Sequence, residues 1–139
     1  MTVLTQTKPL VRTRFDLDQF VADCRSALAA DKSHKLVREV VKRAVAEPGA
    51  VLKELGEPQR AELKTLYRSD DLTILNLIWG PNMVLLPHDH RMWAVIGIYS
   101  GREDNIFWRR AAGPVILRGT RTSGHSHELV RGRAVGLGA

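Results

Sequence analysis

The segment PHDHR, residues 87–91, carries two histidines, His88 and His90, one residue apart in an otherwise largely apolar run. In a β-strand, residues two apart project to the same side, so both imidazoles would share one face while Asp89 faces the other way. Two imidazoles at this spacing can bind one metal ion, at about 2.0 to 2.1 Å each. Burying both rings without partners would cost on the order of 1 to 3 kcal/mol each. The pattern therefore predicts either a metal site or a hydrogen-bonded pair.

The N-terminal part of the chain, residues 1–59, has the apolar spacing of helices. Apolar side chains recur at three-and-four spacing over residues 16–30, where Asp16 and Gln19 have the arrangement of a capping box. The same spacing predicts a second helix over residues 33–46. A proline and a glycine mark the start and end of a short third helix over residues 48–56.

After Pro58 the residue types change to those of β-strands. Most of the aromatic and β-branched residues lie in this region, and they are interrupted by short clusters of Gly, Pro, Asn, Asp and Ser. This alternation predicts an antiparallel sheet, sandwich or small barrel over residues 60–118. We therefore expect one α+β domain, in which N-terminal helices precede the sheet. The Gly- and Arg-rich segment 119–139 is expected to be a poorly ordered tail.

Charge and hydropathy limit the classes of function. No run approaches the roughly 18 to 20 apolar residues of a membrane span, and the N-terminus lacks the pattern of a secretory signal, so a soluble, cytoplasmic protein without membrane partners is expected. The net charge of +6 is concentrated toward the two ends, whereas residues 61–110 are neutral overall. Nucleic-acid binding is therefore not the leading interpretation. Cys24 is the single cysteine and lies in a helical pattern, which is typical of a small buried hydrophobic residue.

The residues around the histidine pair resemble the first metal-binding motif of the cupin superfamily. The segment GPNMVLLPHDHRMWAVIGIYSG runs from Gly80 through His88 and His90 to Gly101 with the spacing of that motif. Ala94 stands where many cupins have a metal-binding glutamate. Thiol dioxygenases, the branch that contains cysteine dioxygenase, are similar in lacking that glutamate. The resemblance covers roughly residues 60–110.

This resemblance implies a function and a set of roles. It implies a cupin-type double-stranded β-helix in which His88 and His90 help to hold Fe(II). The ferrous ion would bind a small carboxylate-bearing thiol and O2, which react to give a sulfinic acid. Arg68 stands where those enzymes carry an arginine that grips the substrate carboxylate, and a guanidinium matches a carboxylate with two parallel donors. Alternatively, Arg68 ends a strand and pairs with Asp70 or Asp71.

The C-terminal part departs from the cupin pattern, because no second motif around a third histidine is found. His125 and His127 are present, but no strand-like pattern surrounds them, so the third metal ligand stays open. The composition after about residue 112 is typical of a shifted reading frame or an altered terminus; if it is authentic, His125 or His127 is the candidate ligand. We expect a sheet that is incomplete at its C-terminal end, self-association through its open edge, and little activity. The alternative function is a non-enzymatic cupin-fold module that binds a small molecule or acts as a scaffold.

Overall fold

A computed structural model of the 139-residue chain describes residues 14–88, 90–110, 117–123, 128–130 and 133–138. It contains three helices, α1 (Leu17–Ala30), α2 (His34–Val45) and α3 (Pro48–Leu55). These are followed by seven strands, β1 (Glu62–Arg68), β2 (Thr73–Ile78), β3 (Trp93–Ile98), β4 (Asp104–Arg110), β5 (Leu117–Ser123), β6 (Glu128–Val130) and β7 (Arg133–Gly138). The predicted α+β class, helices first and strands after, is confirmed.

The helix ends form where the sequence predicts them. The Asp16 carboxylate accepts a hydrogen bond from the Gln19 backbone N–H at 2.8 Å and caps α1. The predicted capping box is only half formed, because the Gln19 side-chain amide donates to Asp23 at 2.8 Å. Ser33 caps α2 in the same way, through the backbone N–H of Lys35. Gly56 ends α3 with a φ of 88°, which glycine adopts without steric cost.

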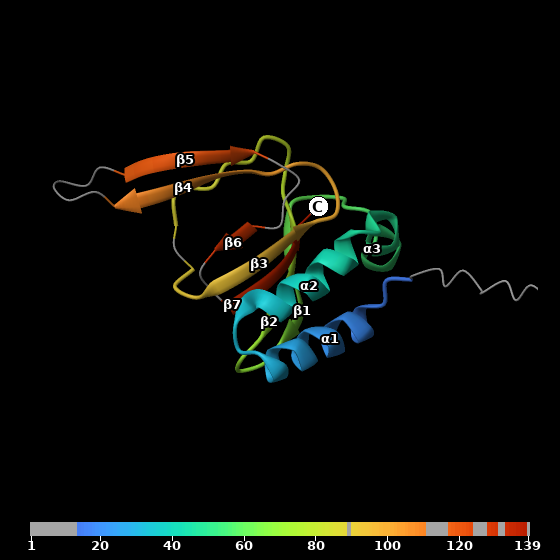
Figure 1. Ribbon diagram of the computed structural model, residues 1–139. Coiled ribbons are helices and arrows are strands. Elements are labelled where there is room, and N and C mark those ends of the chain that lie inside the picture. Colours follow the sequence, from blue (N-terminus) through green and yellow to red (C-terminus); the bar gives the residue numbers. More distant parts are fainter. Residues whose placement is uncertain (1–13, 89, 111–116, 124–127, 131–132, 139) are drawn as a thin grey trace, which may run out of the picture.

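The five-stranded sheet has the order β1-β2-β7-β3-β6, and β4 pairs with β5 in a separate two-stranded sheet. The pairs β1–β2, β3–β6 and β4–β5 are antiparallel, as predicted, whereas β7 runs parallel to both β2 and β3. The prediction of an antiparallel sheet therefore holds for these three strand pairs and is wrong for β7. Ladder hydrogen bonds join backbone groups, so a Gly-rich segment without a period-two side-chain pattern can still pair. Figure 1 shows the helices together on one side of the five-stranded sheet, with the β4–β5 hairpin apart from them.

Three strands, β5, β6 and β7, lie largely within residues 119–139. Strand pairing does not measure how ordered a segment is in solution, so the poorly ordered tail stays a prediction. None of the helices in the described part of the chain is both long and apolar enough to cross a membrane.

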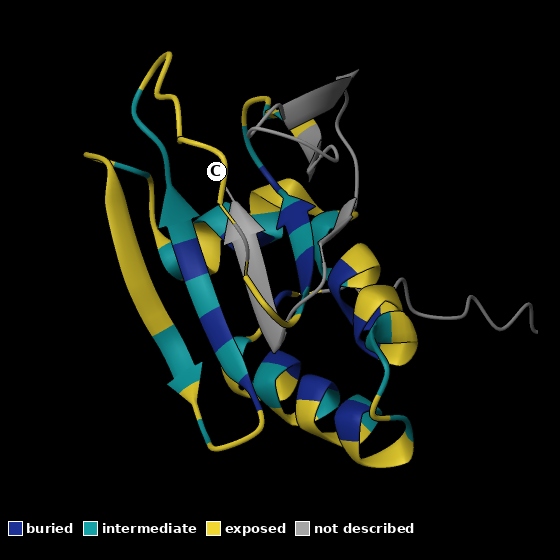
Figure 2. Cartoon of the chain, turned by 90° about the vertical axis from the view of Figure 1, so that its left-hand side faces the viewer, coloured by how far each residue is buried: buried dark blue, intermediate teal, exposed yellow. Residues whose placement is uncertain are grey.

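The main core lies between the helices and one face of the sheet. Alternate residues at the start of β2 are buried, β3 buries Ala94, Val95 and Gly97, and most of β1 is exposed (Figure 2). Helix α2 packs directly on β3, where Gly97 faces Val41 and Val45. At the far end of these strands the Tyr99 hydroxyl donates to the Asn76 amide oxygen at 2.9 Å, which satisfies a buried polar group. This packing holds β2 and β3 in place, and with them the segments that follow Ile78 and Ile98.

Cys24 is fully buried in α1, which confirms its predicted role as a core residue. Burial, with a smaller contribution from the nearby Asp23 carboxylate, raises the pKa of the Cys24 thiol to about 12. The unfolded chain loses this proton near pH 8.5 to 9, while the folded chain keeps it. Between the pKa of the unfolded state and that of the folded state, the unfolded chain binds fewer protons. The free energy of unfolding therefore falls as pH rises, by at most about 1.4 kcal/mol per pH unit.

We therefore expect Cys24→Ala to remove part of the loss of stability on the alkaline side. Urea unfolding under reducing conditions from pH 7.5 to 10.5 measures this for both proteins. The difference in unfolding free energy between wild type and variant should narrow with rising pH. A constant difference over this range would show that the thiol ionises equally easily in both states.

Candidate metal centre

His88 and His90 lie in the irregular segment, residues 79–92, that connects β2 to β3. Because β2 and β3 run in the same direction, this segment has to return from the end of β2 to the start of β3. The histidines lie close to the start of β3, and both are exposed. The prediction that they lie on a strand was wrong, because this part of the chain makes no ladder pairing.

The two imidazoles nevertheless face each other. The Nε2 atoms of His88 and His90 are 3.2 Å apart, and the ring centroids are 4.9 Å apart with planes inclined at 65°. The Nδ1 atom of His88 lies 2.9 Å from the backbone oxygen of Leu86. A carbonyl only accepts hydrogen bonds, so Nδ1 must carry the proton, and Nε2 of neutral His88 keeps a free lone pair. This second contact holds the His88 ring with its lone pair directed at His90.

The geometry of the pair fits a shared metal ion. With metal–nitrogen distances of about 2.0 to 2.1 Å, two ligand nitrogens are about 2.9 Å apart at 90° and about 3.3 Å apart at the tetrahedral angle. The observed 3.2 Å lies between these values. It is equally compatible with a hydrogen bond in which His90 Nε2–H donates to His88 Nε2. Both alternatives from the sequence are thus open to this pair, and both use the Nε2 atoms.

The ligand set is incomplete in the part of the chain that the structure describes. There, no cluster of three or more His, Cys, Asp or Glu side chains is placed to hold one ion. Asp89, His125 and His127 lie outside the described residues. Ala94 is 2% exposed within β3, so the position that resembles the cupin glutamate site is filled by a small buried side chain. Among the described residues, His88 and His90 are the two side chains placed to share one ion.

Arg68 lies at the same end of the sheet as the histidines but is not adjacent to them. It pairs with Thr73 at the start of β2, and the strand register puts this level with the start of β3. Strands β1 and β3 are three strand spacings apart, or about 14 Å. The structure thus brings the two histidines together and leaves Arg68 on the edge strand β1.

The Arg68 side chain is exposed and makes no ion pair with a described residue. The alternative pairing with Asp71 is replaced by a contact of 4.0 Å between Lys32 and that carboxylate. The guanidinium is therefore exposed to solvent at the same end of the sheet as His88 and His90.

A cavity at the opposite end of the sheet was missed from the sequence. Trp79, Asn82 and Glu103 are among the residues that line it. The sequence predicts turns at residues 80–82 and 101–104, and a strand residue that packs the sheet at Trp79. The signal available in the sequence is the pair of polar turns that directly follow β2 and β3.

No protein-family model and no solved structure matches this chain.

Proposed function

We propose that His88 and His90 bind one divalent metal ion through their Nε2 atoms, as part of an iron-dependent, thiol dioxygenase-like cupin site. The 3.2 Å separation of the Nε2 atoms, with His88 oriented by the Leu86 carbonyl, is the observation that supports this most strongly. An outer hydrogen bond of this kind fixes the ring and raises the basicity of the ligating nitrogen. Neutral imidazole ligands suit ferrous iron as well as zinc, copper and nickel.

The reaction that the resemblance implies is the addition of O2 to a thiol. In the balanced step R–SH + O2 gives R–SO2H, so both oxygen atoms end on sulfur and no external reductant is needed. Bound ferrous iron would supply coordination positions for the thiolate and for dioxygen. The protein's own contribution is to hold the ion through His88 and His90 and to bind the substrate carboxylate through Arg68.

Iron loading and oxygen uptake test this proposal. The chain is loaded anaerobically with Fe(II), and oxygen consumption is followed after addition of 3-mercaptopropionate. With two histidines among the described ligands we expect weak iron binding and slow turnover, because affinity depends on a completed ligand set. Thiol-dependent uptake that disappears in the double variant His88→Ala/His90→Ala would support the enzyme.

The alternative function is a non-enzymatic cupin-fold binding or scaffold module, and the exposure of His88 and His90 favours it. The same experiment separates the two functions. Protein that takes up no iron, and whose unfolding temperature does not change with added metal, would support the module.

The role of Arg68 predicts a substrate-dependent effect of Arg68→Lys. Lysine keeps the charge but loses the two-donor fork, so a thiol with a carboxylate should bind about tenfold more weakly. Ethanethiol, which has no carboxylate, should bind unchanged. Binding is measured on cobalt-loaded protein through thiolate-to-cobalt absorption, which needs no turnover. Equal weakening for both thiols would assign Arg68 to the fold.

A further inference from the structure

The ends of β2 and β3 create a second feature, which the metal centre does not use. Both strands run parallel to β7, so their carboxyl ends lie at the same end of the sheet, on either side of β7. Segments that follow the carboxyl ends of parallel strands commonly form ligand sites, because their side chains converge there. Here Trp79–Asn82 follows β2 and Ser100–Glu103 follows β3. Between them lies a cavity of about 220 Å³.

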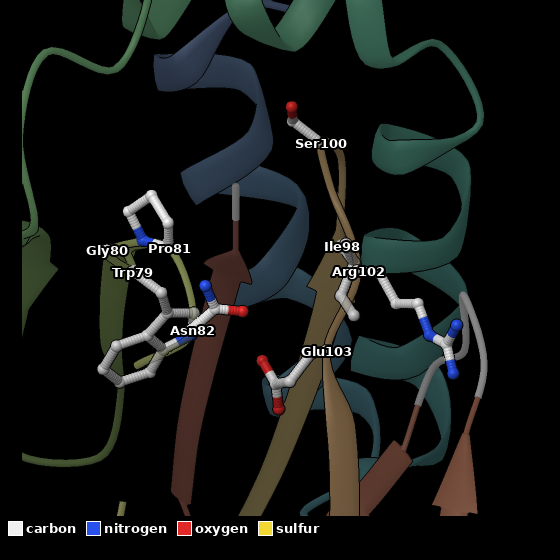
Figure 3. A pocket seen from close by; sticks show the side chains of 8 residues that line it. All are labelled: Trp79, Gly80, Pro81, Asn82, Ile98, Ser100, Arg102 and Glu103. Carbon is white, nitrogen blue, oxygen red and sulfur yellow. The ribbon is translucent and has the colours of Figure 1, made fainter. Parts of the chain in front are cut away.

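The residues around the cavity include an indole ring, neutral polar groups and one carboxylate. Figure 3 shows the Glu103 carboxylate and the Asn82 amide across the cavity from each other, with the Trp79 indole beside Asn82. Trp79, Ser100 and Glu103 are half-buried. The backbone of Asn82 has a φ of 58°, a left-handed conformation that asparagine tolerates, in the turn closed by the hydrogen bond from Met83 N–H to Gly80 O at 3.1 Å.

The charge balance decides which class of ligand suits this cavity. Arg102 also borders it, but its Nε and Nη2 atoms both lie 3.0 Å from one Asp104 carboxylate oxygen, and Figure 3 shows its guanidinium directed away from Glu103. Glu103 makes no ion pair with any residue that the structure describes. The uncompensated charge at the cavity is therefore negative.

We propose that this cavity binds a small organic cation, with an ammonium or methylated ammonium group between the Glu103 carboxylate and the Trp79 indole. A cation over an indole is attracted by the ring quadrupole, and a half-buried carboxylate adds a Coulomb attraction that water screens only in part. The Asn82 carbonyl and the Ser100 hydroxyl can accept hydrogen bonds from an ammonium group. The volume of about 220 Å³ suits a small ligand with a few heavy atoms beyond the cationic group.

Titration of the ¹⁵N-labelled full chain with tetramethylammonium chloride, at constant ionic strength, tests this site. We expect saturable shifts of the Trp79 indole N–H and of the backbone amides of residues 79–82 and 100–103. The neutral isostere tert-butanol and the anion acetate should cause no saturable shift there. Glu103→Gln should weaken cation binding about tenfold, because it removes the charge and keeps the shape.

A matched control and a second variant keep the test decisive. Glu39→Gln, on the exposed face of α2, removes a charge that does not line the cavity and should leave binding unchanged. Trp79→Leu keeps an apolar side chain without the ring and should also weaken binding. Equal binding of tert-butanol, binding of acetate instead, or unchanged affinity in Glu103→Gln would each overturn the proposal, as would the absence of saturation by tetramethylammonium.

Discussion

His88→Ala or His90→Ala is expected to lower the affinity of the chain for a divalent metal ion by at least about 100-fold. Loss of an outer hydrogen-bonding partner alone typically costs 10- to 100-fold, and loss of a direct ligand from a two-histidine site has to cost more. The ion then keeps a single imidazole and water. Isothermal titration with Zn(II) and Co(II), in a buffer that does not bind metal, measures the affinity of each variant.

A histidine outside the pair provides the control for this experiment. His34, at the start of α2, contacts the edge of Trp93 at a ring-centroid distance of 6.4 Å and does not contact either member of the pair. His34→Ala should therefore leave the metal affinity within about twofold of wild type. If both pair variants bind as tightly as wild type, the pair is a hydrogen-bonded surface feature, and the metal proposal fails.

Gly97→Val is expected to have the largest effect on stability. Even a Cβ at this position would lie 2.6 Å from Val41 Cγ1 and 2.7 Å from Val45 Cγ1, closer than carbon atoms pack. Valine side chains in helices are largely restricted to one rotamer, and Val41 is fully buried, so α2 has to move away from β3. We expect Gly97→Ala to cost about 1 to 3 kcal/mol and Gly97→Val to exceed that, measured by urea unfolding.

Two further variants identify the cause. Gly49→Ala in α3 meets nothing within 4 Å, so it should have no steric cost and should gain helix propensity. Val45→Ala combined with Gly97→Ala should be less destabilising than the sum of the two single changes, because one alanine makes room for the other. Strict additivity, or an equal cost at Gly49, would show that loss of glycine itself is responsible and that the contact with α2 is not.

The helices could be predicted from the sequence because their signals are local. Apolar spacing, Asp16 and Ser33 as caps, and Gly56 as a terminator all act within one or two turns of chain. The order of the sheet depends on distant pairing. Nothing in the Gly-rich sequence of β7 indicates that it lies between β2 and β3, since its ladder bonds come from the backbone.

In the candidate site, too, the local features could be predicted from the sequence and the features that depend on sheet order could not. The spacing of His88 and His90 predicts their approach, and the rings do meet, although the segment is irregular and the contact with Leu86 O orients one of them. Arg68 was placed with them by resemblance alone. Its position three strands away follows from the sheet order, which no local pattern encodes. The cavity beside Trp79 and Glu103 requires the parallel arrangement of β2 and β3, so it could not be predicted either.

Long-range ¹H–¹⁵N correlation of the imidazole nitrogens during a Zn(II) titration tests most directly whether both rings bind one ion. Zinc is a diamagnetic substitute for ferrous iron, and it accepts the same neutral imidazole ligands. In the metal-free protein we predict a protonated Nδ1 and a bare Nε2 for His88. The Nε2 resonances of His88 and His90 should shift together as metal is added and should not shift further beyond one equivalent. A shift of only one ring, a shift at Nδ1, or no shift at all would contradict the shared site.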